Sequence, residues 1–163
     1  MDELVHAESG LTKATWTDAD FDAMGWHDCH VHAVSIGVRE EGFPWQRVLI
    51  DLDYIVQWVD PAFGRRHFTF WIAPSTLVFD EAWDISAELD PGNDLLEIAD
   101  LHRLASPDDK PDPLWHIEGQ NFDLRLRSPS YTQYLRTPPI HSNRQYLSQP
   151  DRGGLSFTEQ SFT

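Results

Sequence analysis

The sequence predicts a mainly β fold of the β-rich α+β type, an antiparallel meander or sandwich of about seven strands with a short N-terminal helix. Apolar and polar residues alternate along several segments, which is the pattern of strands with one buried face. Turn residues separate these segments, most clearly at Asp90–Asn93. The length of 163 residues suits one domain, so we expect residues 1–163 to form a single domain.

The helix is predicted within residues 16–24, ahead of the first strand. Acidic side chains in this segment suit the positive end of a helix, and Thr17 or Asp18 can serve as its N-cap. Gly25 follows the segment and favours the end of the helix at that point.

The strands are predicted from alternation, since residues two apart in a strand share a face. The segments with this pattern are 27–38, 47–59, 67–72, 76–79 and 83–89 as one long bent strand, 114–118, 122–127 and 131–135. Residues 95–104 fit both helix and strand periods, and we expect a strand there because the flanking elements are strands. Pro74 interrupts the third of them and favours an edge or a bulge there. Gly119–Asn121 favours a hairpin between 114–118 and 122–127, and Glu40–Pro44 favours a turn.

Residues 138–163 are predicted to form an irregular C-terminal tail. This segment is rich in Ser, Gln, Asn, Pro and Gly, which favour turns and loops. Any order in the tail is expected to come from docking of Tyr146, Leu147, Leu155 or Phe157 on the rest of the domain.

Negative charge is concentrated in the N-terminal part. The net charge is −15; residues 1–100 contain 20 Asp and Glu against 5 Lys and Arg, whereas residues 101–163 contain 7 of each. Such a field attracts basic proteins and repels DNA, whose binding depends on Lys and Arg. A protein partner of basic character is therefore expected, with acidity that serves solubility alone as the alternative. A small basic patch of Arg125, Arg127, Arg136 and Arg144 is the only feature that points toward nucleic acid.

The segment Gly25–His32 contains the side chains best suited to bind a metal. Zinc prefers His nitrogen, Cys sulfur and carboxylate oxygen, and all three types occur here. On a strand, His30 and His32 share a face, and Asp51 or Asp53 of a neighbouring strand would supply a third ligand. A zinc site of His30, His32 and Asp51 is therefore one hypothesis, although neither HExxH nor paired CxxC is present and exposed histidines on a strand are ordinary.

No other pattern indicates chemistry, so we expect no catalytic residue and no cofactor. The chain has neither a Gly-x-Ser-x-Gly nucleophile elbow nor a Gly-rich phosphate loop. Asp51 and Asp53 share a strand face, where paired carboxylates act as acid and base in some enzymes but more often form a solvated surface. Cys29 has His neighbours, but adjacency along a strand does not place an imidazole on the thiol.

The stretch Trp26–Val31 resembles the start of a family of bacterial immunity proteins, small proteins found beside polymorphic toxins. In that family the pattern aromatic-His-Asp-Ala-Glu-Val opens the first strand. Trp26, His27 and Asp28 match it, whereas Cys29 and His30 replace the Ala and Glu.

The resemblance extends over residues 25–127, because Leu77–Ile85 is similar to a later apolar F-x-x-V-x-x-L/I segment of that family. It implies a protein that binds and blocks a toxin and performs no reaction itself. It also implies that His27 and Asp28 organise the start of a strand.

Cys29 is the only cysteine, so no intrachain disulfide forms and a reducing compartment is expected. The N-terminus lacks the pattern of a signal peptide, and no apolar run approaches the roughly 20 residues of a membrane helix. We therefore expect a cytoplasmic protein without membrane association.

Three functional hypotheses follow: an interaction protein such as an immunity-type inhibitor, a metal-dependent enzyme or metal-binding protein, and a structural homo-oligomer suggested by the many Trp and Phe residues. The sequence favours the first, a non-enzymatic protein that binds a basic partner through its acidic N-terminal part.

Overall fold

The structure is a computed structural model that describes residues 7–37, 45–105 and 110–163. The strands in these ranges are β1 (Thr15–Thr17), β2 (His30–Ile36), β3 (Gln46–Val59), β4 (Thr69–Leu89), β5 (Leu96–Leu104), β6 (Leu114–Gly119), β7 (Phe122–Arg127), β8 (Tyr131–Leu135) and β9 (Ile140–Ser142). The helices are the 3-10 helix η2 (Asp18–Ala23) and the single-turn α1 (Gln149–Arg152).

Every strand pairing in the described residues is antiparallel, which confirms the predicted mainly β fold with few helices. The expected number of about seven strands is wrong, because the sheet has 9 strands. The extra strands β1 and β9 have 3 residues each, which is too short for an alternating pattern to be recognised. The turn expected at Glu40–Pro44 lies outside the described residues.

The predicted N-terminal helix forms as η2, with Thr17 as its N-cap. The Thr17 hydroxyl accepts a hydrogen bond from the Ala19 N–H, and the Asp20 carboxylate accepts one from the Thr17 N–H at 3.0 Å. Met24 is the C-cap residue, one position before the expected Gly25.

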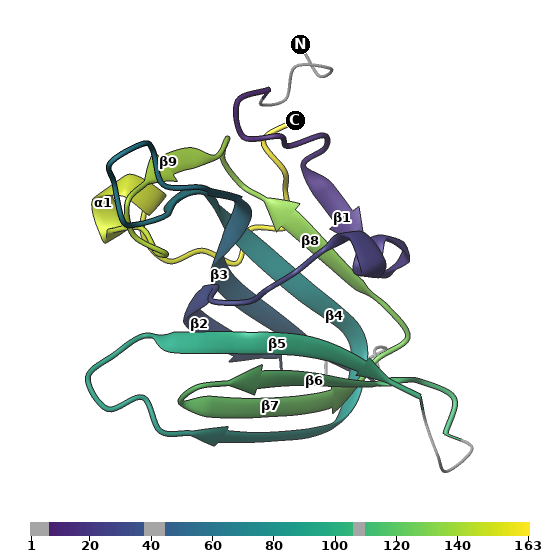
Figure 1. Ribbon diagram of the computed structural model, residues 1–163. Coiled ribbons are helices and arrows are strands. Elements are labelled where there is room, and N and C mark those ends of the chain that lie inside the picture. Colours follow the sequence, from purple (N-terminus) through teal and green to yellow (C-terminus); the bar gives the residue numbers. More distant parts are fainter. Residues whose placement is uncertain (1–6, 38–44, 106–109) are drawn as a thin grey trace.

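The strands close into a ring in which each strand is hydrogen-bonded to the next. The order is β4-β3-β2-β5-β6-β7, and β7 pairs again with β4. β8 and β9 add to the other edge of β4, and β1 follows β8. Figure 1 shows β5, β6 and β7 as a layer that crosses below the layer of β8, β4 and β3.

β4 belongs to both layers because it bends at Glu81–Asp84. Its first part pairs with β3, β8 and β9, and its last part pairs with β7. Glu81 and Asp84 have positive φ values of 49° and 54°, and the register with β7 shifts between Trp83 and Ser86. Bends of this kind allow one strand to pass between packed sheets. The separately predicted strands 67–72 and 76–89 are therefore one strand.

Pro74 lies inside β4, so the expected interruption at this proline does not occur. The Pro74 carbonyl accepts a hydrogen bond from the Arg136 N–H at 2.9 Å. That side of β4 faces the connection between β8 and β9, where the ladder stops at Leu135 and resumes at Ile140. The missing N–H of proline therefore costs no ladder hydrogen bond.

The core between the layers is built on aromatic side chains. Trp26, Phe79, Trp115 and Tyr131 are almost fully buried, and Trp115 and Tyr131 meet edge to face with ring centroids 5.3 Å apart. Val48, Ile50, Leu52 and Tyr54 of β3 are buried in the same cluster. By alternation, Asp51 and Asp53 then point to the opposite face of β3.

The C-terminal segment after β8 is largely irregular and covers that opposite face of β3. It passes through β9 and α1 and ends beside β1 and β8, where the Phe162 N–H donates to the Leu135 carbonyl at 3.0 Å (Figure 1). Of the four expected anchors, Leu147 is buried and Phe157 is half-buried, whereas Tyr146 and Leu155 are exposed. No helix in the described ranges is long and apolar enough to span a membrane.

Candidate functional site

The motif Trp26–Asp28 attaches the chain before β2 to neighbouring strands. The indole N–H of the buried Trp26 donates to the Gln133 side chain at 2.9 Å. His27 is exposed, with Nδ1 3.0 Å from a backbone carbonyl of β5. Asp28 has a φ of 65°, a region that Asp enters more readily than most residues, and its N–H donates to the Ile98 carbonyl at 2.9 Å.

Asp51 and Asp53 form a buried ion cluster with His32, Arg136 and Arg152. Arg152 of α1 donates to both Asp51 oxygens, at 2.6 and 2.9 Å, and to Asp53 Oδ1 at 3.0 Å. Arg136 donates to Asp51 at 2.7 Å, and His32 Nε2 lies 2.8 Å from Asp53 Oδ2. The side chains of Asp51, Asp53 and Arg152 are completely buried.

Backbone groups of the C-terminal segment complete this cluster. The Leu147 N–H donates to Asp53 at 2.8 Å, and the Ser156 N–H donates to Asp51 at 3.0 Å. Burial acts to raise the pKa of Asp51, but hydrogen bonds from the guanidinium groups and from the Ser156 N–H outweigh it and hold that pKa below its ordinary value. The cluster is an internally neutralised anchor for the C-terminal segment and offers no free carboxylate for acid–base chemistry.

The hypothetical zinc ligands His30, His32 and Asp51 have separate partners. His32 is bonded to Asp53, and guanidinium groups occupy both oxygens of Asp51. The His30 ring packs against Tyr146, with centroids 5.1 Å apart. In the described part of the chain, no group of three or more His, Cys, Asp or Glu side chains is arranged to hold a metal ion.

Cys29 is also unsuited to covalent chemistry. Its side chain is buried, and burial raises the pKa of the thiol to about 12. The reactive thiolate form is therefore negligible at neutral pH.

Arg152 is the residue of the cluster that sequence reasoning missed, because it lies in a polar segment expected to be irregular. The Ser148 hydroxyl caps α1 by accepting from the Asp151 N–H, and Gly153, with a φ of 80°, ends the helix. The sequence contained only an indirect signal that a distant arginine joins this cluster. Two aspartates within the otherwise apolar middle of β3, between Val48 and Val56, require basic partners from elsewhere, since buried charges are paired.

Most described basic side chains are engaged within the molecule, so the suggested basic patch does not form. Arg127 is buried and lies 3.3 Å from Asp84, and Arg136 belongs to the ion cluster. Arg125 pairs with a carboxylate of its own strand, which leaves only Arg144 of the four without an ion pair in the described chain. Lys13 pairs with Asp20, and Arg47 pairs with Asp80 and Glu159.

At one end of the molecule, by contrast, four acidic side chains have no ion pair with another described residue. Glu88, Asp90, Asp94 and Glu97 lie at or near the connection between β4 and β5, beside the turn between β6 and β7 (Figure 1). The first three are exposed, Glu97 is half-buried, and residues 85–100 contain no Lys or Arg. None of the four has an ion pair with another described residue. We call these four residues the acidic end.

A pocket of about 450 Å³ opens at the acidic end, and we call it the acidic pocket. The side chains that line it include His30, Asn93, Asp94, Glu97, Gln120 and Tyr146. Carboxylates, amides and two flat rings thus share one cavity whose described lining contains no Lys or Arg. Such a lining suits a cationic group that donates hydrogen bonds.

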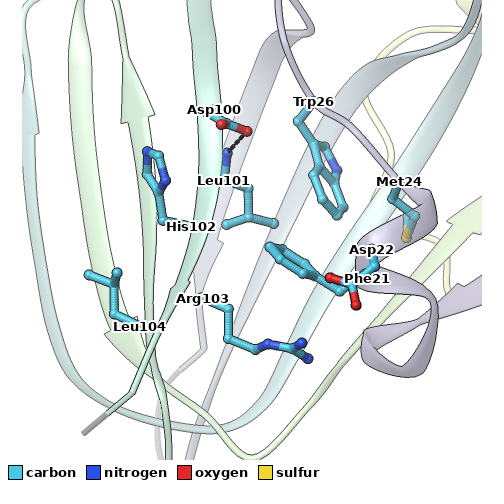
Figure 2. A pocket seen from close by; sticks show the side chains of 9 residues that line it. All are labelled: Phe21, Asp22, Met24, Trp26, Asp100, Leu101, His102, Arg103 and Leu104. Carbon is cyan, nitrogen blue, oxygen red and sulfur yellow. Dashed lines mark hydrogen bonds between the residues drawn. The ribbon is translucent and has the colours of Figure 1, made fainter. Parts of the chain in front are cut away.

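A second pocket of about 400 Å³ lies between η2 and β5 (Figure 2). Phe21 and Trp26 form its apolar wall, with ring centroids 5.9 Å apart, and the Arg103 guanidinium lies 4.7 Å from the Phe21 ring centroid. Asp22 and Asp100 also line this pocket, so it carries both signs of charge. It is therefore less suited to a cation than the acidic pocket.

Comparisons with protein-family models, with curated proteins and with solved structures find no match for this chain. The function is therefore inferred from the residues of the molecule itself.

Proposed function

We propose that this protein is a non-enzymatic interaction protein that binds a basic protein partner through the acidic end. The observation that carries the proposal is the set of carboxylates at the acidic end, three exposed and one half-buried, without a described counter-ion. The same molecule neutralises Asp51 and Asp53 internally. Unpaired carboxylates of this kind are available to attract a basic surface and accelerate its association.

The proposal extends to an immunity-type role, in which the partner is a basic toxin that this protein blocks. Support comes from the resemblance of Trp26–Val31 and Leu77–Ile85 to a bacterial immunity-protein family. We place the protein in the cytoplasm, in keeping with the free thiol of Cys29. Tight binding to the product of the adjacent gene is expected, and failure of the two purified proteins to associate would contradict this role.

The acidic end is tested with a probe of defined chemistry, a decapeptide of lysine residues. The variant Glu88→Gln/Asp90→Asn/Asp94→Asn should bind this peptide roughly tenfold more weakly than the wild type at low salt, because three exposed ion pairs are lost. Asp22→Asn/Asp60→Asn/Glu81→Gln is the matched control, since it removes three exposed charges from other elements.

Calorimetric titration of both variants decides between a local site and a general effect of net charge. A selective loss in the acidic-end variant supports the proposal. Equal weakening in both variants shows that net charge alone attracts the peptide and overturns the assignment of the acidic end.

A second candidate function is self-association, which the hairpin between β3 and β4 favours. Trp58, Phe63 and Phe68 are exposed there, and Arg65 and Arg66 are exposed between them. This apolar and basic tip is complementary in charge to the acidic end of a second copy. Light scattering tests the candidate: a concentration-dependent mass that Arg65→Gln/Arg66→Gln abolishes supports it, and a monomer at all concentrations excludes it.

A further inference from the structure

His30 is an unusual member of the acidic pocket because part of its polar surface is buried without a partner. The residue is 9 % exposed, and Nδ1 has no hydrogen-bond partner in the described structure. Buried polar atoms are nearly always hydrogen-bonded, so an unpaired one in the wall of a cavity indicates a group that a ligand would complete. This observation is independent of the acidic residues nearby.

The His30 ring is suited to accept a hydrogen bond. Burial lowers the pKa of His30, against the opposing effect of Glu97 and the other carboxylates nearby. The imidazole is therefore neutral at pH 7, and a neutral imidazole has one nitrogen that accepts and one that donates. Tyr146, which is 37 % exposed, packs against the ring and lines the same pocket.

The opposite wall of the pocket is held rigidly. The Asn121 side chain accepts from the Glu97 N–H at 3.0 Å and donates to the Leu95 carbonyl at 2.8 Å, which attaches the turn between β6 and β7 to the start of β5. Gly119 precedes this turn, and a Cβ at this position would lie 2.2 Å from the Phe122 ring. The backbone that carries Glu97 and Gln120 is therefore held in place before any ligand arrives, which reduces the ordering cost of binding.

We infer that the acidic pocket binds a guanidinium group, as presented by an arginine side chain of the basic partner. Asp94 and Glu97 supply the counter-charge, and the His30 ring and the amide oxygens of Asn93 and Gln120 supply acceptors. A guanidinium presents five donors in one plane and stacks on flat rings such as Tyr146, whereas an ammonium is a compact point charge. The inference rests on the proposed function and specifies what the acidic end recognises.

The test uses the full chain with 15N-labelled histidine and the peptide Gly-Ser-Arg-Ser-Gly. Matched peptides carry lysine or citrulline in place of arginine, and free agmatine reports whether a small guanidine suffices. The arginine peptide should shift the His30 imidazole signals and bind at least about tenfold more tightly than the citrulline peptide, since neutral citrulline cannot form an ion pair with Asp94 or Glu97. Glu97→Gln should remove most of this difference. His30→Gln provides a second variant, and the wild-type spectra decide the question if either variant folds poorly.

Each outcome has a defined meaning. Preference for arginine over lysine and citrulline, together with His30 shifts, supports the inference. Equal binding of agmatine and the arginine peptide also supports a guanidinium pocket, but it assigns the pocket to a small ligand and counts against a protein partner there. Unchanged His30 signals with all ligands overturn the inference, while the lysine decapeptide separately reports whether the acidic end still binds cations.

Discussion

Two sets of carboxylates distinguish the inside of this molecule from one of its ends. Asp51 and Asp53 are completely buried, and their oxygens accept hydrogen bonds from Arg136, Arg152 and backbone groups. Glu88, Asp90 and Asp94 are exposed and have no ion pair with any described residue. The first set holds the C-terminal segment on β3, whereas the second set is free to meet another molecule.

The structural carboxylates lie beside arginines of the same molecule, whereas the candidate recognition carboxylates do not. A buried charge that loses its partner is strongly destabilising, because its desolvation is no longer offset. An exposed charge without a partner remains solvated and costs the fold little. The same residue type therefore has opposite consequences for stability and binding, and variants in the two sets should separate these effects.

The largest effect is expected for Arg152→Met, which leaves Asp51 and Asp53 without their main counter-charge. The free energy of unfolding should fall by about 3–5 kcal/mol, as for other broken buried ion pairs. Denaturant unfolding at pH 7 measures the change. Arg144→Met is the matched control, because Arg144 is exposed and its side chain has no bond in the described structure; it should change the value by less than about 0.5 kcal/mol. Similar losses in both variants would contradict the anchoring role.

Acidification should gradually remove the stabilisation that Asp51 provides within the ion cluster. The pKa of Asp51 in the folded protein lies below its ordinary value of 3.8, so its contribution is complete above about pH 4 and is lost as the pH falls toward the folded pKa. The difference in unfolding free energy between the wild type and Asp51→Asn should therefore be largest near neutral pH and shrink below pH 4. A difference that grows on acidification would show that folding raises the pKa of Asp51 and does not lower it.

A smaller effect is expected at the rigid wall of the acidic pocket. Gly119→Ala places a Cβ 2.2 Å from the Phe122 ring and 2.7 Å from the Phe122 carbonyl oxygen, so the hairpin must shift. Overpacking of this kind costs about 1–3 kcal/mol, which thermal unfolding can measure. Gly25→Ala is the control, since no atom lies within 4 Å of its added Cβ, and it should leave the melting temperature nearly unchanged.

The smallest effect on stability is expected at the acidic end. Glu88→Gln/Asp90→Asn/Asp94→Asn should keep the free energy of unfolding within about 0.5 kcal/mol of the wild type, because exposed side chains without partners are replaced. Chemical denaturation at pH 7 provides the measurement. A loss of several kcal/mol would place these carboxylates among the structural ones and remove the distinction between the two sets.

The sequence predicted the parts of the fold that depend on local pattern. Phe122–Arg127 forms a strand at the predicted position, because Phe122, Leu124 and Leu126 alternate with polar residues and are buried. Tyr131–Leu135 also forms the predicted strand. One long bent strand over 76–79 and 83–89 was predicted, whereas the positive φ values at Glu81 and Asp84 that accompany the bend were not, since these residues carry no sequence signal for them. The ion cluster was also missed, because Asp51 and Arg152 are far apart in the chain and only the tertiary fold brings them together.

The acidic region was predicted from charge counts, but the structure changes its extent. The acidic residues counted in residues 1–100 include Asp51 and Asp53, which are buried, and Asp20 and Asp80, which pair with Lys13 and Arg47. Periodicity and composition cannot separate these from exposed carboxylates, because pairing depends on distant basic residues. The surface proposed for binding is consequently one end of the molecule and not the whole N-terminal part.

The most direct test of this division measures binding and stability on the same two variants. The acidic-end triple variant should bind the arginine peptide at least about tenfold more weakly while unfolding like the wild type. The control Asp22→Asn/Asp60→Asn/Glu81→Gln should match the wild type in both measurements. Unchanged peptide affinity in the acidic-end variant, or equal weakening in the two variants, would show that the acidic end is not the binding surface.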